Sequence, residues 1–418
     1  MFKGSLKKFK SGNPKIVSIK AYKVLDSRGE WTIKTSVVLS DGSIGVSVIP
    51  NGASKGMREA KYLPNPEAIQ NINTTLNNAL KEHDPYDQQA IDSLMLDLDS
   101  SEFKSELGGN SMIAVSLAVA RASALSQKIE LFQYIANLYG RTDKKFSLPV
   151  PVFNILNGGK HAQNNLSFQE FMVIPALNLP FEKAYEVGVD VYSSLKGILG
   201  HEHINTGVGD EGGFAPSGFT TEKALSYIKQ AVGKKYQVGK DVFFGMDVAA
   251  ESFWKDGKYV ISEENLSLTH TQLADYYGEL VKKFELIYIE DPFFEEDLQG
   301  WEEFYKIYSK KVMVVGDDLV VTNPKYLQKV LNPKMINAVI VKPNQVGTLT
   351  ETLEFVKQAK TAGLTVCVSH RSGDCAEDTF IADLAVGVGA EFMKSGAPAR
   401  GERVAKYNRL LDIYHLLN

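Results

Sequence analysis

The run VFFGMD at residues 242–247 decides the fold, because its pattern returns along the rest of the chain. It is a short apolar run that ends in an acid, and LIYIE at 286–290 and VMVVGD at 312–317 repeat it. Three later apolar runs, 338–341, 366–369 and 391–393, lead into basic residues instead. Such runs, alternating with helical patterns, predict βα units and a parallel sheet. The charged residues at the run ends are, in order, Asp247, Glu290, Asp317, Lys342, His370 and Lys394.

The spacing of these charged residues indicates how the units are arranged. Successive members lie roughly one βα unit apart, which is about 30 residues, and helical patterns at 298–310 and 348–362 fall between them. In a (β/α) barrel the carboxyl ends of the strands converge on one face, where such enzymes keep the active site. One charged residue at a strand end is usually just where the strand meets solvent. Six in series, with acids before bases, predict a catalytic face.

The chain before the barrel has a different texture. Residues 31–39 and 44–48 alternate apolar and polar side chains around Asp41-Gly42, which predicts an antiparallel hairpin, and 110–128 predicts a long apolar helix. We therefore expect an N-terminal α+β capping domain over residues 1–140, with 1–15 as a flexible arm. The catalytic barrel domain is expected over 141–418, which is long enough for the roughly 250 residues of a barrel.

Composition and charge exclude several classes of protein. The 418 residues are 44% hydrophobic and 23% charged, as in a globular protein. A formal net charge of −4 gives no basic field for nucleic acid. The two cysteines, Cys367 and Cys375, are too few for a disulfide framework and lack zinc-site spacing. With no export signal or membrane span visible, we expect a cytoplasmic protein without a nucleic-acid partner.

The residue types at the strand ends indicate the chemistry. Three converging carboxylates without a cluster of Cys or His favour a hard cation, Mg²⁺ first. A lysine facing that cation either balances an anionic substrate or accepts a proton, since a neighbouring cation lowers its pKa. Together they suggest proton abstraction next to a carboxylate. The loop Ser369–Gly373 adds Arg371 and hydroxyls that fit a phosphate clamp, although alone it also fits an ordinary polar loop.

Two further segments place an acid in apolar or glycine-rich surroundings. Glu170 lies in Phe168–Met172, and Glu211 lies in Val208–Gly213. Either carboxyl group can hold a raised pKa and act as a general acid. For Glu170 an edge-strand carboxylate that meets solvent is an equal alternative.

Several motifs, taken together and in order along nearly the whole chain, resemble the enolase (phosphopyruvate hydratase) family. The resemblance implies an N-terminal α+β domain and an atypical (β/α)8 barrel whose early strands break the simple alternation. It also implies a homodimer or higher homo-oligomer. The motifs that carry it are Gly52–Gly56, Asn157–Ala162, Gln169–Met172, Gly209–Gly213, Glu290–Phe293, Gly316–Leu319, Lys342–Gln345, Ser369–Gly373 and Lys394–Arg400.

The resemblance further implies a reaction and roles for the site residues. The reaction is the reversible dehydration of 2-phospho-D-glycerate to phosphoenolpyruvate in glycolysis and gluconeogenesis. Lys342 would take the C2 proton, and Glu211, with Glu170 beside it, would assist loss of the 3-hydroxyl. The remaining implied roles are stabilisation of the carboxylate side of the intermediate for Lys394, phosphate binding for Arg371 and Ser372, closure over the site for His161, and lining of the pocket for Gln169 and His370.

Two Mg²⁺ ions per active site are also implied by the resemblance. Asp247, Glu290 and Asp317 would hold the first, whereas Ser54 and substrate oxygens would hold a second that arrives with substrate. The chain departs from the family at Glu30-Trp31, where Asn-Pro is usual, and at Lys55, where Thr is usual. We hypothesise that the Lys55 cation weakens or partly replaces the second metal.

Two other functions compete with this one. An acid-sugar dehydratase is disfavoured because its substrates lack the phosphate that Ser369–Ser372 would bind. A non-catalytic paralogue that serves as a binding or scaffold protein is disfavoured because it has no need of buried charges that cost stability when unpaired.

Overall fold

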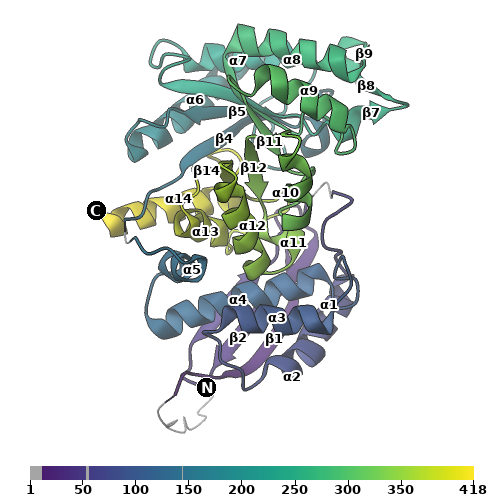
Figure 1. Cartoon of the computed structure of the whole chain (residues 1–418). Helices are drawn as coiled ribbons and strands as arrows, with labels where there is room; N and C mark the ends of the chain where they lie inside the picture. Colours follow the sequence, from purple (N-terminus) through teal and green to yellow (C-terminus); the bar gives the residue numbers. More distant parts are fainter. Residues whose placement is uncertain (1–11, 53–55, 144) are drawn as a thin grey trace.

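The computed structural model describes residues 12–52, 56–143 and 145–418 (Figure 1). Most of the expected flexible arm, together with Ser54 and Lys55, lies outside these residues. The described part of the arm contacts the domain, since Asn13 Nδ2 donates to Asp84 Oδ2 at 2.7 Å.

The N-terminal α+β domain is a three-stranded antiparallel sheet covered by helices. Its strands β1 (Ile16–Leu25), β2 (Trp31–Leu39) and β3 (Ile44–Val48) pair in sequence order, which confirms the predicted hairpin. The long helix α4 (Gly109–Gln127) packs on this sheet so closely that a Cβ on Gly45 would lie 2.0 Å from the Ala118 carbonyl oxygen. The other helices are α1 (Asn65–Asn71), the π-helical η1 (Ile72–Leu76), α2 (Asn77–Leu80), α3 (Gln88–Leu98) and α5 (Leu131–Tyr139).

Eight strands close a barrel, which confirms the predicted fold class. The ring order is β10-β11-β12-β13-β14-β4-β5-β6. β5 runs antiparallel to both β4 and β6, whereas the other neighbours in the ring are parallel. The early strands therefore break the simple alternation, as the resemblance implied. The strands are β4 (Val150–Asn157), β5 (Glu170–Pro175), β6 (Val242–Asp247), β10 (Leu286–Glu290), β11 (Met313–Gly316), β12 (Ala338–Val341), β13 (Thr365–Ser369) and β14 (Phe392–Lys394).

Helices surround the barrel, and apolar side chains fill its interior. Val152, Met172, Tyr288, Ile340 and Phe392 belong to one buried cluster contributed by different strands. The outer helices are α6 (Phe181–His201), α7 (Thr221–Val232), α8 (His270–Phe284), α9 (Leu298–Tyr308), α10 (Pro324–Leu331), α11 (Pro343–Val346), α12 (Leu349–Thr361), α13 (Phe380–Val388) and α14 (Gly401–Leu417), with short helices η2 (Gly159–His161), η3 (Ala250–Phe253) and η4 (Ser262–Glu264) and a small sheet of β7 (Trp254–Lys255), β8 (Lys258–Ile261) and β9 (Leu266–Leu268).

The N-terminal domain lies against one flank of the barrel, next to α11 and α12 (Figure 1). Hydrogen bonds join the two parts: the Leu349 N–H donates to Ser116 Oγ at 3.0 Å in a buried contact, and the Thr350 N–H donates to Asp92 Oδ2 at 2.9 Å in a partly buried one. The domain boundary after residue 140 stays a prediction.

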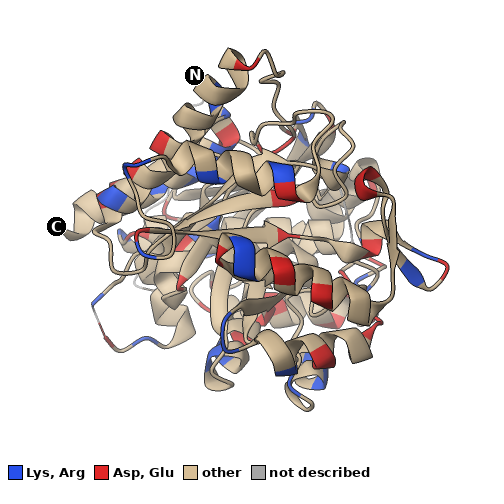
Figure 2. Cartoon of the chain, turned by 90° about the horizontal axis from the view of Figure 1, so that it is seen from above, with Lys and Arg blue, Asp and Glu red and all other residues tan. Residues whose placement is uncertain are grey.

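Acidic and basic residues are mixed over the helices around the barrel (Figure 2). In the described part of the chain, no single helix is long and apolar enough to span a membrane. The consecutive helices α4 and α5 pass that test together by length and composition, but they are bent by 108°.

Candidate active site

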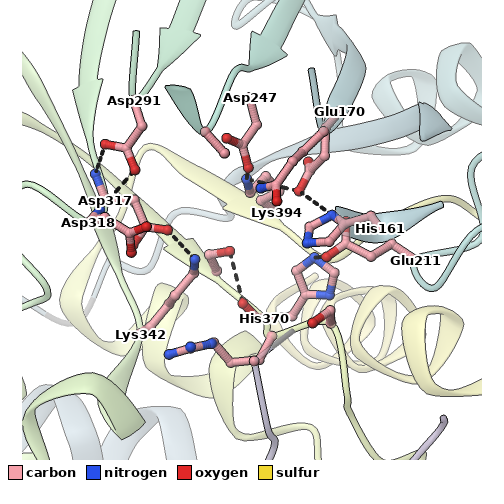
Figure 3. Close-up of a pocket in the computed structure, with 16 residues that line it drawn as sticks. His161, Glu170, Glu211, Asp247, Asp291, Asp317, Asp318, Lys342, His370 and Lys394 are labelled. Atoms are coloured by element: carbon pink, nitrogen blue, oxygen red, sulfur yellow. Dashed lines mark hydrogen bonds and ion pairs between the residues drawn. The ribbon is translucent and has the colours of Figure 1, made fainter. Parts of the chain in front are cut away.

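A pocket opens at the carboxyl ends of the barrel strands (Figure 3). Of the described residues predicted for the site, only Glu290 is not in its wall. The predicted residues that line it are His161, Gln169, Glu170, Glu211, Asp247, Asp317, Lys342, His370, Arg371, Ser372 and Lys394.

The reversed direction of β5 explains how Glu170 reaches this pocket. Glu170 is the first residue of β5, and it pairs in register with Asp247, the last residue of β6. Two carboxylates therefore come to the same end of the barrel from strands that run in opposite directions. Glu170 is 1% exposed inside a closed ring, so the alternative of an edge-strand carboxylate in solvent is wrong.

Lys394 contacts three acidic residues that lie at the ends of other barrel strands. It ends β14, is 1% exposed, and its Nζ donates to Glu290 Oε2 at 2.9 Å and to Asp247 Oδ2 at 3.3 Å. Glu170 Oε1 accepts from the same Nζ at 3.4 Å. Tyr288 supports Glu290 from below, because its hydroxyl donates to Glu290 Oε2 at 2.5 Å. One buried cation thus contacts three buried carboxylates.

Lys342 and Asp317 form a second group on the neighbouring side of the pocket. The Lys342 Nζ donates to Asp317 Oδ2 in a close ion pair. Asp317 Oδ1 accepts from Gln345 Nε2 at 2.9 Å, and Thr322 Oγ1 donates to Gln345 Oε1 at 2.8 Å. The same Thr322 oxygen accepts the Lys342 N–H at 2.9 Å. Lys342 and Asp317 are therefore held by one shared network.

Charged neighbours set the pKa values of the two lysines. Burial lowers the pKa of Lys342, but the surrounding carboxylates, Asp317 first and then Glu290, together raise that pKa above its usual value. Burial also lowers the pKa of Lys394. Glu170, Glu290 and Asp247 outweigh burial and raise that pKa well above its usual value. Arg371 and Lys394 do lower the pKa of Lys342, as expected of neighbouring cations, but the carboxylates outweigh them; the effect of a metal ion on this pKa stays a prediction.

Two acids that sequence reasoning missed lie beside Asp317. Asp291 has a left-handed backbone, with φ +42°, and its carboxylate accepts the N–H groups of Asp317 at 3.0 Å and Asp318 at 2.9 Å. Burial, together with the surrounding carboxylates, raises the pKa of Asp291 and that of Asp318 well above the usual range. Both residues fall inside the quoted motifs at 290–293 and 316–319. The second acid in each motif was therefore the signal that could have identified them.

The acid-rich side of the pocket fits a divalent cation. Asp291, Asp317 and Asp318 each offer an oxygen, and these atoms lie within 4.8 Å of one another. Carboxylate oxygens are the ligands that Mg²⁺ prefers. The raised pKa values of Asp291 and Asp318 indicate an excess of negative charge that a cation would relieve, whereas Lys342 holds the pKa of Asp317 below its usual value despite burial. The set expected from the sequence, Asp247, Glu290 and Asp317, stays a prediction. Ser54 lies outside the described residues.

Glu211 approaches from the opposite side of the pocket, on the loop between α6 and α7 (Figure 3). That loop is pinned in place, since the Asp210 N–H donates to the His161 carbonyl at 2.9 Å and the Ala397 N–H donates to the Glu211 carbonyl at 2.9 Å. Asn154, a polar residue in the apolar strand β4, donates through Nδ2 to Glu211 Oε2 at 2.9 Å. Sequence reasoning missed Asn154.

Glu170, Glu211 and His161 meet as one buried group. His161 Nδ1 lies 3.5 Å from Glu211 Oε2 and 3.7 Å from Glu170 Oε1. Burial and the negative charge of Glu211 raise the pKa of Glu170 well above the usual range. Burial also acts on Glu211, but the nitrogens of His161, His370 and Arg403 hold its pKa well below the usual range. Of the two acids that could hold a raised pKa, Glu170 therefore has one and Glu211 does not.

Four orphaned polar atoms point to a ligand in this part of the pocket. Glu170 Oε2, His161 Nδ1, Gln169 Oε1 and His370 Nε2 are buried without a hydrogen-bond partner among the described residues. Because buried polar groups are nearly always paired, a polar substrate is the natural partner for them.

The expected phosphate-binding loop is anchored by a residue from the other domain. Both terminal guanidinium nitrogens of Arg371 contact the Glu59 carboxylate, Nη1 to Oε2 at 2.9 Å and Nη2 to Oε1 at 3.1 Å. Arg371 and Glu59 are 6% and 8% exposed. The bidentate pair fixes the plane of the guanidinium, so Glu59 positions Arg371. The sequence offered no spacing that would link these two residues.

The fold and this pocket together define a class of protein. A closed barrel with acids, lysines and an arginine at the carboxyl ends of its strands has the architecture of a (β/α)8-barrel enzyme. Two family models match the chain: the N-terminal domain of enolase over residues 16–135 and the C-terminal TIM barrel domain of enolase over residues 145–418. The chain belongs to the enolase family. Membership supports an enolase-family lyase activity.

Proposed function

We propose that this chain catalyses the Mg²⁺-dependent, reversible dehydration of 2-phospho-D-glycerate to phosphoenolpyruvate and water. The observation that carries the proposal is that Lys342 and Glu211 enter one pocket from opposite sides (Figure 3). Loss of water from neighbouring carbons needs a base at one carbon and an acid at the hydroxyl of the next. Lys342 and Glu211 would supply this base and this acid to a substrate bound between them.

Lys342 is the proposed base. Its amine accepts the C2 proton as the C2–H bond breaks, and the electron pair stays on the carbon next to the substrate carboxylate. Lys342 must first lose the proton that the Asp317 ion pair stabilises. The proposal therefore requires that Asp317 exchanges Lys342 for another partner before the proton is taken.

Glu211 and Glu170 are the proposed acid pair. As the C3–O bond breaks, the electron pair at C2 forms the new double bond, and the hydroxyl leaves as water with a proton from the pair. The opposite pKa shifts of the two carboxyl groups support one shared proton, held on Glu170 while Glu211 is ionised. We assign the donor step to Glu211, with Glu170 as its partner; the proposal therefore requires that the shared proton passes from Glu170 to Glu211 before the hydroxyl leaves.

The remaining residues hold the substrate in this proposal. Arg371 and Ser372 take the phosphate, and Lys394 balances charge on the carboxylate side. His161 would close over the site from η2, and it is already buried in the pocket wall at 7% exposed. Gln169 and His370 line the pocket and offer the orphaned polar atoms described above.

Two Mg²⁺ ions complete the proposed site. Asp247, Glu290 and Asp317 would hold the first, and Ser54 with substrate oxygens would hold a second that arrives with substrate. When bound, Mg²⁺ supplies positive charge that stabilises the negative charge of the enolate-like intermediate. Lys55 is proposed to weaken or partly replace the second ion; if Lys55→Thr leaves the magnesium dependence of activity unchanged, that idea fails.

The substrate assignment is tested by following 2-phospho-D-glycerate with ³¹P NMR in the presence of Mg²⁺, and again after addition of a chelator. We expect the phosphoenolpyruvate signal only with the metal. Dehydration of an unphosphorylated sugar acid in its place would favour the acid-sugar dehydratase. No reaction from folded protein would favour the scaffold paralogue. Light scattering tests the expected homo-oligomer, and cell fractionation tests the expected cytoplasmic location.

A further inference from the structure

Arg403 lies directly behind the acid side of the pocket. It belongs to the first turn of α14 and is 0% exposed. Its guanidinium donates to the carbonyl of Asp210 at 3.0 Å, to that of Arg371 at 2.8 Å and to that of Ser372. These carbonyls flank the loop of Glu211 and the loop of His370. Arg403 therefore ties together the two segments that carry the acid and its histidine neighbour.

Arg403 also contacts the His370 ring itself. Its Nη1 lies 2.5 Å from His370 Nδ1, and both side chains are buried. A guanidinium carries only donors, because it does not lose its proton in proteins. The Nδ1 atom must therefore accept, so it carries no hydrogen. The one hydrogen of a neutral ring is then on Nε2.

The other edge of the ring faces the reaction. His370 Nε2 lies 3.4 Å from Glu211 Oε1 and has no hydrogen-bond partner among the described residues. Hydrogen bonds of catalytic groups are often long until substrate binds. An Nε2–H at this place donates to the Glu211 carboxylate or to a substrate oxygen beside it. An Nε2 without hydrogen would compete with the substrate hydroxyl for the proton of Glu211.

The charges around the ring favour its neutral form. Burial, Arg403 and the more distant Lys394 and Lys342 lower the pKa of His370 well below 6.5, against the opposing effect of the Glu211 carboxylate. Asp374 lies on the far side, with its Oδ2 3.7 Å from Arg403 Nη1. Arg403 therefore supplies positive charge on the His370 side of Glu211, whereas His370 contributes a hydrogen-bond donor.

We propose that Arg403 is a positioning residue that fixes His370 as the neutral Nε2–H tautomer, with the donor directed at Glu211. The inference rests on the proposed function for the role of Glu211. In the dehydration direction, Glu211 becomes a carboxylate as it gives up its proton, and the Nε2–H then stabilises it. In the reverse direction the same donor keeps His370 from taking that proton.

The test is ¹⁵N NMR of the full chain labelled at histidine, because ring nitrogen shifts distinguish the two neutral tautomers. His370→Gln identifies the His370 signals by their absence. We expect the Nε2–H tautomer in the unchanged protein and loss of that single tautomer in Arg403→Met. Arg409→Met is the matched control: Arg409 lies on the same helix and pairs with Asp383 and Glu130, away from the pocket. It should leave the His370 signals unchanged.

Kinetics supply the second readout. Loss of a group that fixes a histidine tautomer costs about 10- to 100-fold in activity, so kcat of Arg403→Met should fall by that factor with little change in KM. A Nδ1–H tautomer or a charged ring in the unchanged protein overturns the inference, even if Arg403→Met does not fold. Absence of turnover by the unchanged protein overturns the proposed function instead. The NMR measurement of the tautomer does not depend on turnover, so the two failures can be told apart.

Discussion

The Nζ of Lys394 lies 2.9 Å from Oε2 of Glu290, although the two residues end strands on opposite sides of the barrel. Asp247 and Glu170 contact the same Nζ, so one lysine is the shared cation of three carboxylates from three strands. The site is thus a set of coupled buried charges, and removing any one of them has consequences for stability as well as for activity.

Lys394→Met should destabilise the metal-free protein more than other lysine replacements. Breaking a buried ion pair by removing one partner costs about 3–5 kcal/mol, and here three carboxylates lose their shared cation. Thermal unfolding in a chelator measures the loss. Lys357→Met, an exposed helix position, is the control. Equal melting temperatures for the two variants would show that the folded state does not depend on Lys394 as the cation of these carboxylates.

Mg²⁺ should raise the stability of the unchanged protein, because an ion that binds only the folded state stabilises it by about 2.7 kcal/mol at one hundred times its Kd. Asp247→Asn should lose most of that gain, whereas Asp412→Asn, which removes an exposed carboxylate on α14, should keep it. Melting temperatures with Mg²⁺ and with chelator check this. A gain retained in full by Asp247→Asn would remove Asp247 from the metal-binding set.

Arg371→Lys should weaken substrate binding, because lysine cannot reproduce the bidentate contact with Glu59 or a fork around a phosphate. A lost hydrogen bond to a charged group is worth about 1.5–3 kcal/mol, so KM should rise roughly 10- to 100-fold while kcat changes less. Steady-state kinetics measure the split. Arg409→Lys loses a bidentate contact outside the pocket and should keep the original KM. Unchanged KM in Arg371→Lys would argue against a phosphate at this arginine.

Asp92 should make stability depend on pH at the junction of the two domains. Burial raises its pKa from 3.8 to about 6, and Thr350 and Gln88 donate to it. Because the folded pKa is the higher one, its contribution to stability is present below about pH 4 and is lost as pH rises through 6.

The wild type should therefore gain about 1.4 kcal/mol relative to Asp92→Asn between pH 7.5 and pH 5. Urea unfolding of both proteins at the two pH values gives the difference, with Asp97→Asn, an exposed position on the same helix, as the reference. Parallel pH profiles for Asp92→Asn and wild type would contradict the raised pKa.

Much of the fold was predictable from local pattern. The strand ending in Asp247 and the helix over 110–128 follow from apolar periodicity, which needs no knowledge of distant contacts. Several charged strand ends, spaced about one βα unit apart, also indicated a closed barrel with one active face. Glu170 was harder to place, because only the reversed direction of β5 brings the first residue of a strand to the active face.

The partners of the site residues were not predictable, for a physical reason. Arg371 and Glu59 are 312 residues apart in the chain and meet only because the two domains pack together. The lowered pKa of Glu211 likewise depends on Arg403 and two histidines from separate segments. Asn154 could have been noticed as a polar side chain inside an apolar strand. Its contact with Glu211 explains why a polar residue lies there.

The central claim is that Lys342 removes a proton from 2-phospho-D-glycerate in a magnesium-dependent dehydration. The most direct measurement is the ultraviolet absorbance of the enol phosphate formed by the unchanged protein and by Lys342→Ala, each with Mg²⁺ and with chelator. We predict product only from the unchanged protein with Mg²⁺. No product from that folded protein, or product at an undiminished rate from Lys342→Ala, would contradict the account.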